Sequence, residues 1–200
     1  EEGFLPFGLF IVADGMGGQE KGERASFLAT EVTAARMVRE IYLPLLGSEE
    51  HVSARRPIHE ALTEAVIAAN TVVHETVPEA GTTLTAAMIL GNTAYIAHVG
   101  DTRAYLIKRG SIRQLTQDHS LLARLVELGQ VSPEEAINHP QRNVLYRALG
   151  QAGGLEVDIY SQPLPPESRL LLCSDGLWGV VPQNEIATIV VTTPDPQEAC

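Results

Sequence analysis

Three apolar stretches of this 200-residue chain each run directly into an aspartate. They cover residues 9–14 (LFIVAD), 96–101 (IAHVGD) and 170–175 (LLLCSD). Short apolar runs of this length are typical of buried β-strands, so Asp14, Asp101 and Asp175 are expected where strands end. Because a sheet structure can bring several strand ends to one edge, the sequence predicts a cluster of three carboxylates.

A cluster of three carboxylates suits a cation. Two carboxylates about 4 Å apart repel each other by about 4 kcal/mol at an effective dielectric constant of about 20, and a third adds to that repulsion. Gly15 and Gly176 directly follow two of the acids, and a glycine lets the chain turn sharply and leave its carbonyl groups open to a ligand. A metal ion is therefore the first hypothesis for this site.

Composition and charge narrow the function classes. The length suits one domain, and 44% hydrophobic residues are enough for a sizeable core. The net charge of −11 argues against binding nucleic acid or an anionic membrane through a general basic surface. We expect no membrane segment or signal peptide, because no apolar run approaches the roughly 20 residues that span a bilayer. Cys173 and Cys200 lack the spacing of a zinc site or disulfide framework, which favours the cytoplasm.

Hydrophobic periodicity predicts an α+β fold. Alternation with a period of two indicates hairpins that turn at Gly91-Asn92 and Arg109-Gly110, so the sheets should be largely antiparallel. Apolar residues at three- and four-residue spacing indicate amphipathic helices before the first hairpin. Helices are expected at 21–46 and 57–75, and strands at 7–13, 82–90, 93–99, 155–161 and 169–173.

The glycine loop at residues 14–18 (DGMGG) does not fit the common phosphate-binding patterns. A dinucleotide fingerprint begun at Gly15 needs glycine where the chain has Glu20, and a phosphate loop needs lysine where it has Glu23. No arginine follows Cys173 closely enough for a cysteine-dependent phosphatase loop, and no serine lies in a G-x-S-x-G setting. With these patterns excluded, the remaining interpretation is chemistry at a metal ion held by acidic side chains.

Six segments, in order along most of the chain, resemble the metal-dependent serine/threonine protein phosphatases of type 2C in their bacterial form. They are 10–26 (FIVADGMGGQEKGERAS), 81–89 (GTTLTAAMI), 97–107 (AHVGDTRAYLI), 115–120 (LTQDHS), 142–150 (RNVLYRALG) and 170–181 (LLLCSDGLWGVV). The resemblance implies a sandwich of two largely antiparallel β-sheets flanked by helices, within one catalytic domain over residues 1–200. It also implies a flap at 117–150.

The same resemblance assigns roles to the acids. Asp14 resembles the carboxylate that bridges two metal ions, and Gly15 the residue whose carbonyl binds one of them. Asp175 resembles the acid that completes the other ion, while Asp101 and Asp175 resemble the ligands of a third, more weakly held ion. Hard oxygen donors of this kind imply Mn²⁺ or Mg²⁺. The implied reaction is hydrolysis of phosphoserine or phosphothreonine esters by a water between the ions, on phosphorylated protein substrates of a serine/threonine kinase system.

Other residues receive weaker assignments. His98 is expected to pack in a strand, and His119 to start a helix or to contact substrate. In the flap, leucines at 121, 122, 125 and 128 are expected to anchor a helix over 121–129, leaving Arg124 and Gln130 free to meet a protein substrate. No general acid or substrate-binding residue is identified.

The two ends of the chain lack parts of the family pattern. The first strand of the family, with its arginine and Asn-Glu-Asp motif, is not present, and neither is the final Asp-Asn ligand. Asp195 followed by Pro196 predicts the start of a helix, so we expect the protein to continue beyond Cys200. The alternative is a degenerate, non-catalytic regulatory or binding module, which a missing downstream Asp-Asn would favour.

Overall fold

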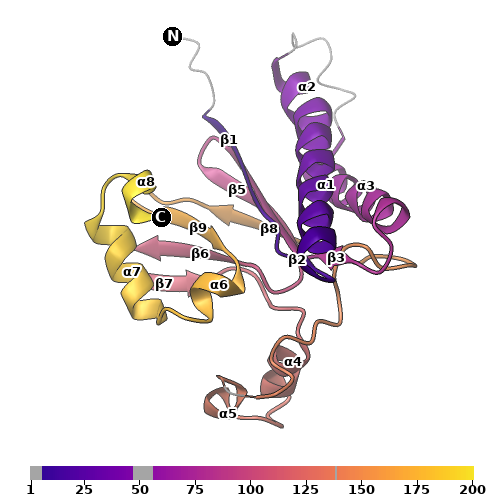
Figure 1. The fold of residues 1–200 in the computed structure, drawn as a ribbon. Helices are drawn as coiled ribbons and strands as arrows, with labels where there is room; N and C mark the ends of the chain where they lie inside the picture. The colour runs from indigo at the N-terminus through magenta and orange to yellow at the C-terminus, as the bar shows by residue number, and fades with distance from the viewer. Residues whose placement is uncertain (1–5, 47–55, 138) are drawn as a thin grey trace.

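The computed structural model describes residues 6–46, 56–137 and 139–200, which form two stacked antiparallel sheets with helices on both outer faces (Figure 1). The four-stranded sheet has the order β1-β4-β5-β8, and the three-stranded sheet has the order β7-β6-β9. Every pairing among the described strands is antiparallel, as predicted. The strands are β1 (Phe7–Val12), β2 (Gly15–Met16), β3 (Gly81–Thr82), β4 (Leu84–Leu90), β5 (Thr93–Val99), β6 (Arg103–Lys108), β7 (Ser111–Gln114), β8 (Asp158–Pro163) and β9 (Arg169–Cys173).

Both predicted hairpin turns are confirmed. Gly91 has a φ of 61° between β4 and β5, and Arg109 and Gly110 have φ values of 52° and 80° between β6 and β7. The two successive positive φ angles at Arg109-Gly110 match the right-handed twist of the flanking strands, which explains why a two-residue turn suffices there. The turn at Gly91-Asn92 brings the end of β5, and with it Asp101, back beside the start of β4.

Helices α1 (Gln19–Met37) and α3 (Ile58–Thr76) lie side by side on the outer face of the four-stranded sheet (Figure 1). The predicted helix at 21–46 is interrupted, because a π-helical turn over Val38–Tyr42 separates α1 from α2 (Leu43–Leu46). Small residues allow the two helices to approach closely. The buried core of this layer includes Ala25, Ala29, Leu62, Ala65, Val66, Ala69, Val73, Ala86, Met88, Ala97 and Val99.

Two further cores complete the layers. Between the sheets lie Ala87, Ala94, Ile96 and Ala104, and on the far side of the three-stranded sheet Tyr105 and Ile107 pack against α6 and α7. The last helices are α6 (Asp175–Trp178), α7 (Gln183–Thr192) and α8 (Pro196–Ala199). Asp195 caps α8 by accepting a hydrogen bond from the Gln197 backbone N–H, which confirms the predicted helix start.

The segment between β7 and β8 projects away from the sandwich and carries α4 (Leu121–Glu127) and α5 (Pro133–Ile137) (Figure 1). Ser120 caps α4 by accepting a hydrogen bond from the Ala123 backbone N–H. The expected anchoring by leucines holds in part, because Leu122 is buried and Leu121 and Leu125 are half-buried, whereas Leu128 is 53% exposed. One backbone hydrogen bond, from the Leu121 N–H to the Val144 carbonyl at 2.8 Å, also ties the segment together.

Asn70 on α3 fixes the turn that leads out of this segment. Its side-chain oxygen accepts a hydrogen bond of 2.8 Å from the Gly150 backbone N–H, and its amide donates to the Gln151 carbonyl at 3.4 Å. Gly150 has a φ of 95°, and a Cβ there would lie 2.5 Å from the Ala80 carbonyl oxygen. The turn therefore needs both the glycine and its buried partner.

We expect Asn70→Ala to lower the free energy of unfolding by about 1–3 kcal/mol, because it leaves the half-buried Gly150 N–H without its partner. Urea denaturation followed by circular dichroism measures this change. Thr71→Ala, on the exposed face of the same helix, should stay within about 0.5 kcal/mol of the wild type. Equal stability of both variants would contradict the role of Asn70.

Candidate metal centre

The fold brings the three strand-end acids into one electrostatic cluster. Asp14 follows β1, Asp101 lies two residues beyond β5, and Asp175 begins α6 directly after β9. Burial raises the pKa of Asp14, and so do the negative charge of Asp175 and a side-chain hydrogen bond with it. These two side chains are therefore direct neighbours across the two sheets.

Asp101 is the most enclosed of the three acids, at 8% exposed. Burial raises its pKa to about 6, with further contributions from the negative charges of Asp175, Asp118 and Asp14. A raised pKa means that the environment disfavours the ionised carboxylate. The cluster is thus a place where added positive charge stabilises the folded protein.

The main chain of Asp14 is held by two threonines, Thr82 at the end of β3 and Thr83 between β3 and β4. The Asp14 backbone N–H donates to Thr83 Oγ1 at 3.0 Å, while its carbonyl accepts from the Thr83 N–H at 2.9 Å and from Thr82 Oγ1 at 3.0 Å. Gly15 then packs against α1 so tightly that a Cβ would lie 1.9 Å from the Gly22 carbonyl oxygen. Only glycine fits there.

Trp178 ties Asp101 to the helix that carries Asp175. Its indole Nε1–H donates to the Asp101 carbonyl at 3.0 Å, and the Arg103 guanidinium lies 3.5 Å from the centre of its ring. Arg103 in turn forms a buried bidentate ion pair with Asp118, with a shortest distance of 2.6 Å. Sequence analysis missed this group, although an arginine two residues after Asp101 and a tryptophan three residues after Asp175 were its visible signals.

His119 holds the residue before Asp101 from two sides. Its backbone N–H donates to the Gly100 carbonyl at 2.7 Å, and its ring Nδ1 accepts from the Gly100 N–H at 3.0 Å. Because Nδ1 accepts, the ring proton resides on Nε2, which donates to Asp158 at 3.2 Å. Arg147 Nη1 lies 3.1 Å from the same Nε2 and therefore donates to Asp158, at 2.8 Å, rather than to the ring. The prediction that His119 starts a helix is wrong, since Ser120 is the cap and His119 is buried at 2% exposure.

His98 is a core histidine, as predicted. It is fully buried, its Nε2 donates to the Gln117 carbonyl at 3.0 Å and its Nδ1 lies 2.9 Å from Thr85 Oγ1. Burial, together with the nearby His119, lowers the pKa of His98 to about 4. A neutral imidazole satisfies both hydrogen bonds, so His98 serves the packing of the sheets.

The donor chemistry of the cluster fits a hard cation. It offers the carboxylate oxygens of three aspartates, which are ligands for Mg²⁺ or Mn²⁺, and none of the three is a thiolate or an imidazole. Across the described ranges, however, no group of three or more histidine, cysteine, aspartate or glutamate side chains could hold an ion alone. Water and backbone carbonyls would have to complete the coordination.

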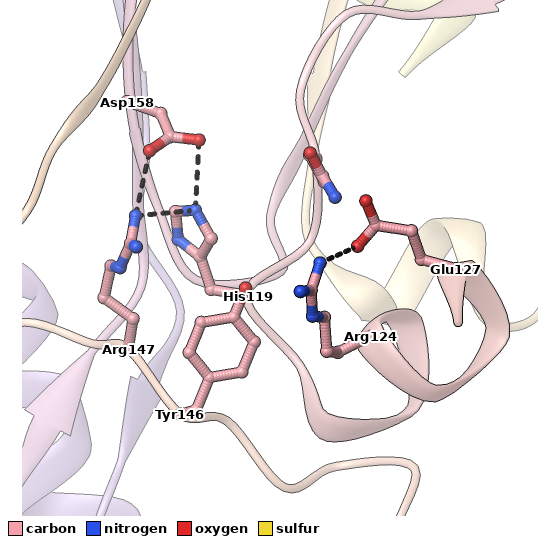
Figure 2. A pocket seen from close by; sticks show the side chains of 7 residues that line it. His119, Arg124, Glu127, Tyr146, Arg147 and Asp158 are labelled. Atoms are coloured by element: carbon pink, nitrogen blue, oxygen red, sulfur yellow. Dashed lines mark hydrogen bonds and ion pairs between the residues drawn. The ribbon is translucent and has the colours of Figure 1, made fainter. Parts of the chain in front are cut away.

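A cavity of about 490 Å³ has His119 in its wall, and His119 binds Gly100, the residue before Asp101 (Figure 2). Arg124 lines it as an ion pair with Glu127, and Gln130 does not belong to its lining. A smaller hollow of about 300 Å³ shares two residues with it, Tyr146 and Arg147. The side chains labelled in Figure 2 are His119, Arg124, Glu127, Tyr146, Arg147 and Asp158.

Comparison with known proteins gives consistent matches over nearly the whole chain. The family model for protein phosphatase 2C matches residues 7–193. The serine/threonine phosphatase stp of Listeria welshimeri is 40% identical over 182 residues, which cover 91% of this chain and 71% of that protein. Protein phosphatase PhpP of Streptococcus pneumoniae D39 is 34% identical over 194 residues, covering 92% and 73% respectively.

Solved structures agree with these matches. The crystal structure of the serine/threonine phosphatase Stp1 from Staphylococcus aureus superimposes with a TM-score of 0.81 and 32% identity, covering 96% of this chain and 74% of that one. The catalytic domain of the serine/threonine protein phosphatase PstP, in complex with two manganese ions, gives a TM-score of 0.76 and 31% identity, covering 96% and 76%.

The raised pKa of Asp101 makes a prediction for the metal-free protein. The pKa of Asp101 is about 6 in the folded protein and 3.8 ordinarily. Between about pH 4 and 6, therefore, the Asp101 carboxyl is protonated in the folded state and ionised in the unfolded chain. The contribution of Asp101 to stability therefore falls as the pH rises from 4 to 6, by at most about 3 kcal/mol. Asp101→Asn should unfold at higher urea than wild type at pH 7 in chelator, and the difference should shrink at pH 4. A variant that is less stable at pH 7 would contradict this.

Proposed function

The chain belongs to the protein phosphatase 2C family, and we infer that it is a metal-dependent hydrolase of phosphoserine and phosphothreonine esters in proteins. The observation that carries this inference is the electrostatic cluster of Asp14, Asp101 and Asp175, in a chain whose residues 7–193 match the family. The relatives that match are named as phosphatases, which favours an enzyme over a non-catalytic binding module.

The proposed ligands are the acids and the carbonyl of the glycine loop. Asp14, the Gly15 carbonyl and Asp175 would hold the two central ions, with Asp14 shared between them. Asp101 and Asp175 would hold a third ion more weakly. The complex of PstP with two manganese ions supports Mn²⁺ at the central pair, and the oxygen donors equally suit Mg²⁺. When bound, such ions supply Lewis acidity and activate water for attack on phosphorus.

The protein residues supply orientation. Thr82 and Thr83 fix the main chain of Asp14, and Gly15 keeps α1 close behind the loop. Trp178 and His119 fix the main chain around Asp101 from opposite directions. The carboxylates repel one another when they are ionised. Because these contacts already hold them together in the folded protein, the free energy of bringing them together does not add to the barrier of the reaction.

The wider setting of the enzyme is also a proposal. Its substrates are phosphorylated proteins, which we place in a serine/threonine kinase system. A cytoplasmic location rests on the two cysteines, which are unpaired, with Cys173 buried and Cys200 exposed. We propose one catalytic domain over 1–200, with 117–150 as a flap beside the active site. Among the described residues no helix is long and apolar enough to cross a membrane.

We expect the full-length protein to release phosphate from a phosphothreonine peptide only with Mn²⁺ or Mg²⁺. Excess chelator should abolish turnover, and added metal should restore it. Asp14→Asn should lower kcat at least about 100-fold while leaving circular dichroism unchanged, because it removes the bridge between the ions. Glu31→Gln, on the exposed side of α1, is the control. Full activity in chelator, or in Asp14→Asn, would overturn the proposed function.

A further inference from the structure

We propose that the cavity between α4 and the segment 146–158 is a docking groove that binds a basic side chain of the substrate, a few residues from the phosphorylated one (Figure 2). This inference rests on the proposed function and names the chemistry of the substrates that it favours. It assigns binding roles to Glu127, Tyr146 and Glu156, which the metal cluster does not use.

The groove has the size of a ligand site. Its main part holds about 490 Å³, and the adjoining hollow of about 300 Å³ lies against the same two residues, Tyr146 and Arg147. Ligand pockets commonly fall between about 300 and 1,000 Å³. The lining is mainly polar and charged, so an apolar ligand is a poor match.

One residue joins the groove to the metal cluster. The His119 ring forms part of the groove wall, and its Nδ1 accepts a hydrogen bond of 3.0 Å from Gly100, the neighbour of Asp101. Gly100 is the residue before Asp101, so one hydrogen bond joins the groove wall to the main chain of the cluster. An extended peptide advances about 3.3–3.6 Å per residue, so a substrate residue a few positions from the phosphorylated one can reach the groove.

The charges of the groove favour a cation. Arg124 is paired with Glu127, and Arg147 is paired with Asp158 at 2.8 Å and with Glu156 at 2.6 Å. Each arginine of the wall is therefore paired with at least one carboxylate. The three carboxylates outnumber the two guanidinium groups, which leaves the wall with an excess of negative charge. Glu156 is 81% exposed at its side chain and keeps acceptor capacity for a second cation.

Tyr146 adds a surface for the same ligand. It is 49% exposed in the wall, although its ring already contacts His119 at a centroid distance of 5.8 Å. The Arg147 guanidinium lies 5.9 Å from the centre of the Tyr146 ring, at the outer limit of a cation–π contact. An incoming guanidinium or ammonium group can cover the ring and reach Glu127 or Glu156. An anion would instead have to displace a carboxylate from an arginine.

The test uses phosphothreonine peptides that differ at one position. Arginine, alanine or glutamate is placed two, three or four residues to either side of the phosphothreonine, and kcat/KM is measured for the full-length protein with Mn²⁺. We expect arginine at one or more positions to raise kcat/KM about 5- to 20-fold over alanine. The double variant Glu127→Gln, Glu156→Gln and the variant Tyr146→Ala should each reduce this ratio to about 2 or less. Glu31→Gln, outside the groove, should keep the full ratio.

Two results would contradict the proposal that the groove binds a basic side chain, while leaving the proposed function intact. One is equal kcat/KM for all peptides, and the other is an arginine preference that survives in the double variant. A preference for glutamate would show an anion site and would also reject the proposal. If no peptide is hydrolysed, the proposed function fails, and calorimetry of the arginine and alanine peptides then tests the groove alone. Equal affinity of the two peptides would reject it.

Discussion

Repulsion among three aspartates is the constraint on which the rest of the site depends. Asp14, Asp101 and Asp175 come from the ends of strands in two different sheets, so only the stacked arrangement of those sheets brings them together. Burial and mutual charge raise the pKa of both Asp14 and Asp101. Holding the three acids together therefore lowers the stability of the metal-free sandwich, and a bound cation would remove this repulsion.

The scaffold resists this repulsion through hydrogen bonds to the main chain at Asp14 and around Asp101. Threonines of the β3–β4 region hold Asp14, the Trp178 indole holds Asp101, and His119 holds Gly100. None of these bonds uses the carboxylate oxygens, which remain available to ligands. His119 also binds Asp158 and thereby connects the aspartate cluster to the groove between α4 and the segment 146–158.

Much of the fold follows from local sequence signals. The turns at Gly91-Asn92 and Arg109-Gly110 were predictable because their backbone angles depend on the residues at the turn itself. The cap at Asp195 was predictable for the same reason. Apolar runs that stop at an acid predicted where strands end, and Asp14, Asp101 and Asp175 do follow the ends of β1, β5 and β9.

The errors have a common physical cause, which is contact between residues distant in sequence. His119 appeared to be a helix start because its partners, Gly100 and Asp158, lie 19 and 39 residues away. The bond from Trp178 to Asp101 spans 77 residues and leaves no periodic pattern. The leucines at 121, 122, 125 and 128 matched the apolar face of a helix, yet α4 projects from the sandwich, so Leu128 contacts no core.

The most direct measurement is a crystal structure of the full-length protein grown with Mn²⁺, with anomalous difference density recorded for manganese. The repulsion described above predicts at least one strong peak between the Asp14 and Asp175 carboxylates, and a weaker peak beside Asp101. Density there that disappears on soaking with chelator would identify the cluster as the cation site. Ordered carboxylates with no anomalous peak at saturating manganese would contradict it.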